Sequence, residues 1–103
     1  GDSPFSMVTG IKIKKQDTPY GLCTSSGTFG HSKSFGRADA VTILSDSCTL
    51  ADATATALCN RVKARKDIES VINTGKAVPG IRGIVIIKDD AIGAWGDLEL
   101  VQL

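Results

Sequence analysis

Apolar and polar residues alternate in short runs over the first part of the chain, which predicts strands joined by turns. Residues 7–14 (MVTGIKIK) have the pattern of a strand with a lysine-bearing outer face. The cluster at 17–21 predicts a turn, and 22–25 predicts a short returning strand. Residues 26–37 are rich in Gly, Ser and Thr without a hydrophobic period, so we expect a loop before strand character resumes at 38–44.

The middle of the chain has the spacing of two helices. The first is expected from Thr49 to about Val62, and Thr49 with Asp52 matches the capping pattern [ST]-x-x-[DE]. A second, shorter helix is expected over 66–74, where apolar residues recur at helical spacing. Its apolar stripe consists of Ile68, Val71 and Ile72, and Asp67 is its expected cap. Gly75 and Pro79 are the signals that end it.

The C-terminal part returns to strand patterns. Residues 81–88 (IRGIVIIK) form a β-branched run, which predicts a well-buried strand. A turn at 89–90 and a last strand over 91–103, with Leu98, Leu100 and Val101 as candidate inward-facing residues, complete the chain. Strands, two helices and strands again predict an α+β two-layer sandwich, an antiparallel sheet with two helices on one face. We expect residues 1–103 to form a single domain.

Composition and charge narrow the classes of partner. Of 103 residues, 42% are hydrophobic, which is enough for one small core. The formal net charge is +1, so no overall field attracts nucleic acid or an anionic membrane. No apolar run approaches the roughly 20 residues of a membrane span. We therefore expect no nucleic-acid partner and no membrane.

The cysteines and the first residue bear on the setting of the chain. Cys23, Cys48 and Cys59 are odd in number and lack CxxC spacing, which argues against a zinc site or a disulfide framework. A reducing, cytoplasmic compartment is expected. The chain begins at Gly1 without a methionine or a targeting-type segment, so we expect a processed, cleaved or truncated piece.

The alanine-rich stretch over residues 49–60 carries the strongest chemical signal. Asp52 and Thr56 stand four residues apart, so both project from one helix face, among alanines that let a ligand or ion come close. Their oxygens suit a hard cation. A structural interpretation competes, because a carboxylate near a helix start also stabilises the orphan amide groups there.

The loop from Cys23 to Arg37 is a second candidate site. Glycine-rich backbone there favours an anion-binding nest, and Lys33 can neutralise a phosphate. The candidate ligand-binding residues are Thr24, Ser25, Ser26, Gly27 and Lys33. The loop has neither a Walker A nor a GxGxxG pattern, so an ordinary surface loop stays open as an alternative. His31, the only histidine, is a candidate general base or a polar surface residue.

One aromatic residue also has two interpretations. Trp95, flanked by glycines in GAWG, is a core residue at a strand bend or a flat apolar wall for a ring-shaped ligand.

Three stretches together resemble a known family. They are CTSSGTFGHSKSFGRADAVTIL, LADATATALCNRV and GIRGIVIIKDDAIGAWGDLELV. Nearly the whole chain resembles the C-terminal half of the short, uncharacterised archaeal and bacterial branch of the ApbE-like superfamily. The longer members are flavin transferases, which use FAD and magnesium to attach FMN to a threonine of a target protein. The resemblance implies a T-fold-like half. One helical layer leaves the other face of a short sheet in need of cover, so we expect the chain to pack against its own N-terminal half, a second copy or another partner chain.

The resemblance also assigns residues. The transferases draw magnesium ligands from the Asp and Thr of A-D-A-x-x-T-A, and Asp52 and Thr56 match these in Ala51 to Ala57. Ser26-Gly27 looks like the Ser-Gly that ends the preceding segment. The His-x-x-Asp-Pro-x-Thr-Gly segment of the transferases is absent from this sequence, which leaves the equivalence of His31 open.

The resemblance therefore implies magnesium-dependent flavin (FAD or FMN) binding or FMN transfer. The alternative is a non-catalytic flavin- or nucleotide-binding protein that has lost the transfer activity, and a homo-oligomer is compatible with both.

Overall fold

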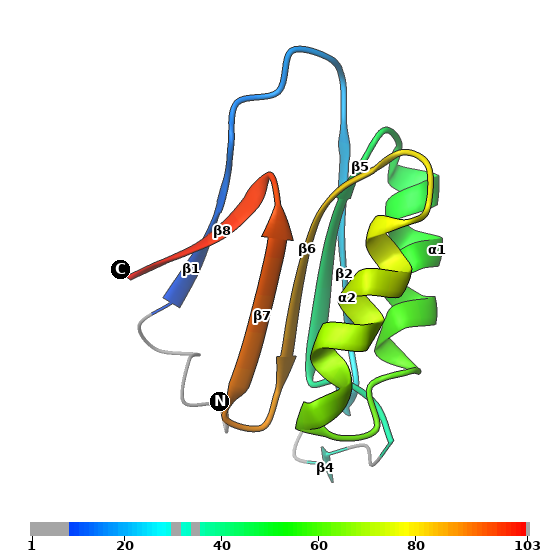
Figure 1. The fold of residues 1–103 in the computed structure, drawn as a ribbon, viewed down its shortest axis with the longest axis vertical. Coiled ribbons are helices and arrows are strands. Elements are labelled where there is room, and N and C mark those ends of the chain that lie inside the picture. The colour runs from blue at the N-terminus through cyan, green and yellow to red at the C-terminus, as the bar shows by residue number, and fades with distance from the viewer. Residues whose placement is uncertain (1–8, 30–31, 34–35, 103) are drawn as a thin grey trace.

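The computed structural model describes residues 9–29, 32–33 and 36–102 (Figure 1). For residues 28–33 only the backbone of two short strands is described. In chain order the elements are β1 (Thr9–Ile13), β2 (Gly21–Ser26), β3 (Thr28–Phe29), β4 (Ser32–Lys33), β5 (Ala40–Ser45), α1 (Cys48–Cys59), the 3₁₀ turn η1 (Arg65–Asp67), α2 (Ile68–Lys76), β6 (Ile81–Lys88), β7 (Ala91–Gly96) and β8 (Leu98–Gln102).

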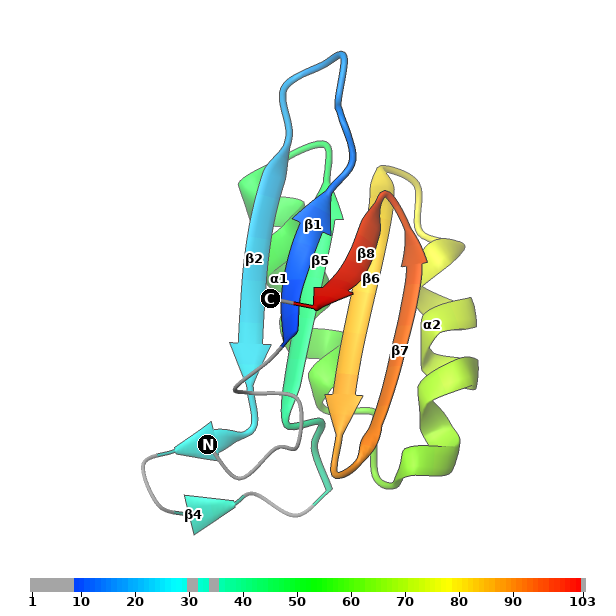
Figure 2. The same cartoon turned by 90° about the vertical axis from the view of Figure 1, so that its left-hand side faces the viewer.

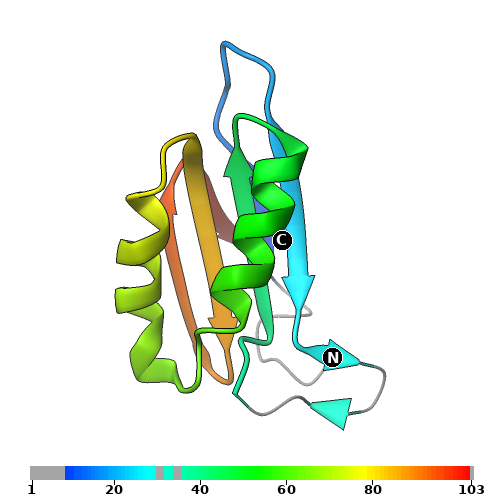
Figure 3. The ribbon, with the colours of Figure 1, turned by 90° about the vertical axis from the view of Figure 1, so that its right-hand side faces the viewer.

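A four-stranded antiparallel sheet forms the centre of the fold. Its strand order is β2-β5-β6-β7, so β2 and β7 are its two edges. Both helices lie on one face, α1 against β2 and β5 and α2 against β6 and β7 (Figures 1 and 3). The prediction of an α+β two-layer sandwich is confirmed.

The main core fills the space between the sheet and the helices. Alternate residues of β5 and β6 point toward the helices, because successive side chains of a strand face opposite sides. The fully buried members of this core are Ala38, Val41, Ile43, Ala51, Val62, Ile84 and Ile86. Burying a valine or isoleucine side chain is worth about 1.5 to 3 kcal/mol, so this layer supplies the main stabilisation.

The other face of the sheet is partly covered as well. β1 and β8 pair with each other and cross this face as a separate two-stranded ribbon (Figure 2). Leu44 and Val85 of the sheet are buried beneath the ribbon, together with Leu98 of β8. Leu100 packs against them, so the predicted inward orientation of Leu98 and Leu100 is confirmed.

The start of α1 differs from the prediction. Ser47, not Thr49, is the N-cap, and its Oγ accepts a hydrogen bond from the Leu50 backbone N–H at 3.1 Å. The helix begins at Cys48, which places Asp52 in its second turn, beyond the unpaired amides of a helix start. The capping role predicted for Thr49 and Asp52 is therefore wrong. The helix also ends at Cys59, before the predicted Val62.

The second helix also differs in detail. Asp67 occupies the N-cap position of α2, as predicted, but its side chain makes no capping hydrogen bond to that helix. Its Oδ2 instead accepts hydrogen bonds from the backbone N–H groups of Lys63 and Ala64, both at 3.0 Å. The prediction ended this helix at Gly75, but α2 passes through that glycine and ends at Lys76. Gly75 is buried and its Cβ position lies 2.7 Å from side-chain atoms of Leu58 and Ile84, so it marks a close contact between elements.

Two further predictions are corrected by backbone geometry. The single strand expected over 91–103 is two strands, because Gly96 adopts φ +78° and turns the chain between β7 and β8. The loop expected over 26–37 contains the paired strands β3 and β4, and β2 extends to Ser26. No helix in the described residues is long and apolar enough to cross a membrane.

Candidate functional site

Asp52 and Thr56 lie on the exposed face of α1. The helix buries Ala51, Thr54, Ala55, Leu58 and Cys59 against the sheet and leaves Asp52, Ala53, Thr56 and Ala57 in solvent. Ser47 caps the helix through the Leu50 N–H, and Asp52 lies beyond the amides of the helix start. No hydrogen bond or ion pair holds it within the part of the chain that the structure describes. The pair is thus available to an external ligand.

The edge strand β2 runs alongside this helix face. The contact is tight at its start, since the Cβ position of Gly21 lies 2.2 Å from the Cys48 backbone nitrogen. From there α1 and β2 run in the same direction (Figure 3). Four helical residues rise about 6 Å and two strand residues about 6.6 Å. A residue four positions further along α1 therefore stays level with a residue two positions further along β2. Since Gly21 lies beside Cys48, Cys23 lies beside Asp52.

The electrostatics of Cys23 support this alignment. Its thiol is partly buried and its Sγ lies 3.6 Å from the Cys48 carbonyl oxygen. Burial raises the pKa of the Cys23 thiol above its ordinary value, and the nearby Asp52 carboxylate and Cys48 thiol raise it further. Cys23 therefore stays a neutral thiol near pH 7, which disfavours a soft, thiolate-bound metal here.

The residues of β2 divide between the two faces of the sheet. Cys23 and Ser25 face α1, in register with Ile43 and Val41 of the main core. Thr24 points to the other face, where its Oγ1 lies 2.8 Å from Thr42 Oγ1. Only Ser25 of these hydroxyl-bearing candidates therefore lies on the same side as Asp52.

The end of β2 is held by backbone bonds. The Ser26 hydroxyl and the Gly27 N–H both donate to the Asp39 carbonyl, at 3.0 and 3.2 Å. Lys33 pairs with Thr28 in the β3–β4 ribbon, while its side chain lies outside the description. His31 also lies outside the described residues. The ligand and catalytic roles predicted for these residues stay predictions.

The donor set around Asp52 is small. No group of three or more His, Cys, Asp or Glu side chains suited to a metal ion occurs among the described residues. Asp52 and Thr56 supply one carboxylate and one hydroxyl. A cation bound here would complete its shell with water or with oxygens of its ligand, as magnesium commonly does.

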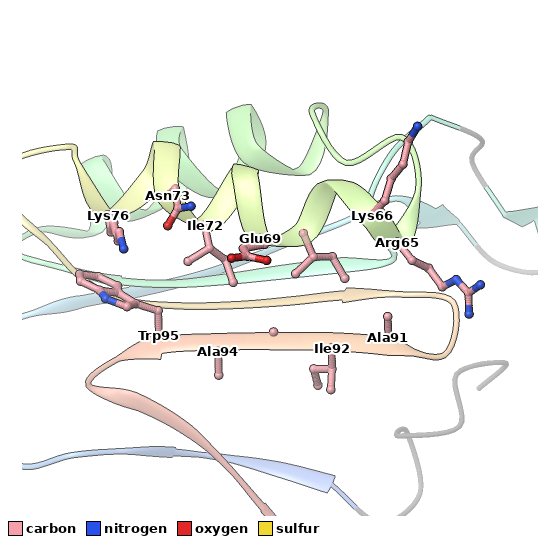
Figure 4. A pocket seen from close by; sticks show the side chains of 12 residues that line it. Arg65, Lys66, Glu69, Ile72, Asn73, Lys76, Ala91, Ile92, Ala94 and Trp95 are labelled. Atoms are coloured by element: carbon pink, nitrogen blue, oxygen red, sulfur yellow. The ribbon is translucent and has the colours of Figure 1, made fainter.

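A groove lies at the opposite edge of the sheet, between α2 and β7 (Figure 4). It has a volume of about 500 Å³. Ile72 reaches down from α2 toward the strand, and Lys76 lies above the indole of Trp95 (Figure 4). Trp95 is half-buried and packs against the main core, which supports the core interpretation. It also lines the groove, and its role as a wall for a ring-shaped ligand stays a prediction.

Sequence reasoning missed two features of these sites. The polar stripe Glu69, Asn73 and Lys76 follows helical spacing and could have been found from the sequence. The approach of Cys23 to Asp52 had no such signal, because the two residues belong to different elements.

Known proteins resemble this chain over most of its length. Residues 1–99 match the family described as AbpE bacteria. The UPF0280 protein of Methanosarcina acetivorans is 45% identical over 98% of the chain, which covers 40% of that relative. The UPF0280 protein of Methanocaldococcus jannaschii is 41% identical over 99% of the chain and 44% of its own length. The chain thus spans about two fifths of the length of these relatives. It belongs to the AbpE bacteria family.

Proposed function

We propose that the α1/β2 edge binds magnesium together with a phosphorylated flavin or nucleotide. The observation that carries the proposal is the Asp52–Thr56 pair, which is exposed on one face of α1 and takes no part in capping the helix. The match of this pair to the magnesium ligands of the ApbE-like flavin transferases supports the same assignment. FAD is the ligand that this resemblance implies.

The chemistry of the pair fits magnesium. A carboxylate and a hydroxyl are hard oxygen donors, and magnesium is commonly held by one or two carboxylates with water and ligand phosphates. The neutral thiol of Cys23 leaves oxygen as the main donor at this edge. A bound magnesium would neutralise phosphate charge and orient the bond to be broken.

The ligand would extend from Asp52 along β2. Ser25 faces α1, and the chain continues through Ser26 and Gly27 toward the β3–β4 ribbon. In the proposal Lys33 neutralises a phosphate and backbone amides near Gly27 contact it, with Thr24 and Ser26 shaping the strand end. His31 is the proposed proton-transfer residue.

Two functions use this site. The first is transfer of FMN from FAD to a target protein. The second is flavin or nucleotide binding without transfer, and the absence of a His-x-x-Asp-Pro-x-Thr-Gly segment from this sequence favours it. Because the chain spans two fifths of its relatives, we also propose that a further chain segment or a second copy completes the site. Its thiols suit a reducing, cytoplasmic setting.

Calorimetric titration with FAD and with ADP, in magnesium and in EDTA, tests the proposal. Asp52→Asn and Thr56→Val should weaken magnesium-dependent binding about tenfold or more. The first removes the negative charge of a cation ligand and the second removes a hydroxyl oxygen, while each keeps the shape of the side chain. Both residues are exposed, so the thermal melts should stay within about 2 °C of wild type.

Matched changes on the other helix serve as controls. Glu69→Gln and Thr74→Val alter an exposed carboxylate and an exposed hydroxyl of α2 and should leave binding unchanged. If Asp52→Asn and Thr56→Val bind both ligands like wild type in magnesium, the metal site is wrong.

A further inference from the structure

The outer side of β7 is an open sheet edge that runs beside a groove. β7 pairs with β6 on its inner side, and no other described strand pairs with it. Its outer backbone N–H and C=O groups are therefore a template for one more strand. The groove between β7 and α2 follows the same edge, so side chains of an added strand would enter it. Proteins that bind extended peptides by strand addition use this arrangement.

The middle of the groove favours an apolar side chain. Gly93 lies beneath two isoleucines of α2, with its Cβ position 2.6 Å from Ile68 Cγ2 and 2.9 Å from Ile72 Cδ1. Ile68 is buried, whereas Ile72 is half-buried and lines the groove. In a ladder, residues opposite each other project from the same face of the sheet. A residue opposite Gly93 in an added strand therefore lies beside Ile72, where an apolar group extends the contact.

Basic side chains stand at both ends of the groove. Lys76 lies above Trp95 at one end, and Arg65 and Lys66 lie near the start of β7 at the other (Figure 4). Arg65 pairs with a neighbouring carboxylate, but neither lysine has an ion-pair partner among the described residues. Glu69 is the only carboxylate among the described residues that line the groove, and it lies between the two ends. The ends therefore attract negative charge and the middle does not.

We propose that β7 binds an extended peptide segment of another protein, with the pattern acidic-x-apolar-x-acidic. The apolar residue lies opposite Gly93, and the two acidic residues lie opposite Ala91 and Trp95, near Lys66 and Lys76. The spacing agrees, because four strand residues span about 13 Å and the ten positions from Lys66 to Lys76 rise about 15 Å.

A second copy of this chain does not supply that pattern. No two acidic residues of the sequence stand four positions apart. The groove-facing residues of β7 itself, Ala91, Gly93 and Trp95, carry no charge, and pairing two copies would bring basic groove ends together. The occupant is therefore an acidic segment of a partner. Its site lies at the sheet edge opposite Asp52 and does not depend on ligand binding there.

Titration with synthetic peptides tests the proposal. Trp95 is the only tryptophan of the chain, so its fluorescence reports binding in the groove. The probe is the end-blocked peptide Thr-Thr-Glu-Thr-Val-Thr-Glu-Thr-Thr, and its matched control has Lys in place of both Glu. The wild-type chain should bind the Glu peptide at least about tenfold more tightly than the Lys peptide. The variant Lys66→Glu/Lys76→Glu should reverse this preference, a result that a misfolded chain cannot give.

Two further measurements separate strand addition from general charge attraction. Lys76→Glu should weaken the Glu peptide about tenfold, whereas Lys12→Glu, which reverses the same charge on β1, should leave it within about twofold. N-methylation of alternate peptide residues should abolish binding in one set and spare it in the other, because successive N–H groups of a strand point to opposite sides.

Several outcomes contradict the proposal. They are no fluorescence change with the Glu peptide up to about 1 mM, equal affinity for the two peptides, and equal effects of the two methylation sets. A wild-type dimer that excludes the Glu peptide also overturns it, since a second copy then occupies the edge.

Discussion

The two edges of the central sheet each have a helix beside them, but they differ in the side chains they offer. At the β2 edge, α1 has alanines and short oxygen-bearing groups, with Asp52 and Thr56 exposed. At the β7 edge, α2 has isoleucines beneath a stripe of longer polar side chains, and a groove of about 500 Å³ lies between them. The groove between α2 and β7 therefore lies at the edge opposite the proposed metal ligands.

This difference separates two kinds of binding surface. A metal site needs a few hard donors that a ligand can reach closely, and small neighbours such as Ala53 and Ala57 allow that approach. A protein interface needs complementary shape and charge over a broader area. The proposed magnesium site at the β2 edge has the first property, whereas the β7 edge has a broader groove lined by apolar and longer polar side chains. The volume of a groove is thus a poor guide to the chemistry of this chain.

The largest expected effect compares one substitution at both edges. Gly21→Ala should lower the free energy of unfolding by about 3 kcal/mol, because the new Cβ meets the Cys48 backbone, which cannot move without shifting α1. Gly93→Ala should cost about 1 kcal/mol, since its Cβ meets side-chain methyl groups of Ile68 and Ile72 and no backbone atom. Urea denaturation of dilute protein measures both. Equal losses would show that the two helices sit equally tightly on the sheet.

Next in size is the effect of the helix cap. Ser47→Ala should lower the free energy of unfolding by about 1 kcal/mol, because the Leu50 N–H loses its acceptor. Thr49→Ala and Asp52→Ala should each change it by less than about 0.5 kcal/mol, since neither residue caps α1. Thermal and urea unfolding of the three variants decide this. A loss at Asp52 as large as that at Ser47 would return the carboxylate to a structural role.

A smaller effect concerns Cys23. Since the Asp52 carboxylate raises the pKa of this thiol, Asp52→Asn should lower that pKa and increase the thiolate fraction near pH 8. Alkylation of Cys23 by iodoacetamide, followed by peptide mass spectrometry, should become about twofold faster. Magnesium should accelerate alkylation of the wild-type chain in the same direction, and not that of Asp52→Asn. Unchanged alkylation rates in both experiments would show that the Asp52 carboxylate does not influence the Cys23 thiol.

The smallest effect is expected at the end of the groove. Arg65 donates a hydrogen bond to Asp90 and lowers the pKa of that carboxyl below its usual range. Because the carboxyl has a lower pKa in the folded state than in the unfolded state, the ion pair stabilises the fold at pH values above the unfolded-state pKa. This stabilisation is lost as the pH falls through the folded-state pKa. Both groups are exposed, so Asp90→Asn should reduce Tm by less than about 2 °C at pH 7 and not at all in strong acid. A large or pH-independent change would contradict this.

Local patterns predicted the elements of this chain because secondary structure follows the period of nearby residues. The β-branched run 81–88 is β6, and the alanine-rich segment is α1. The pairing of Asp52 with Thr56 is likewise local, since four residues make about one helical turn. The first residue of α1 was harder to predict, because two neighbouring residues could each cap the helix. Ser47 and Thr49 are both acceptable caps by residue type, and the contact between Gly21 and Cys48 fits a helix that begins at Cys48.

Tertiary structure alone decided which residues meet across elements. Strand order made β2 and β7 the edges, and only then did Cys23 come to lie beside Asp52 and Trp95 beside Lys76. The turn at Gly96 also depended on the fold, because Asp97 N–H bonds to the Arg82 carbonyl on the neighbouring strand. Sequence by itself determined the helices, most strands and the oxygen pair. The fold determined their neighbours, because contacts between distant residues depend on packing that no local period encodes.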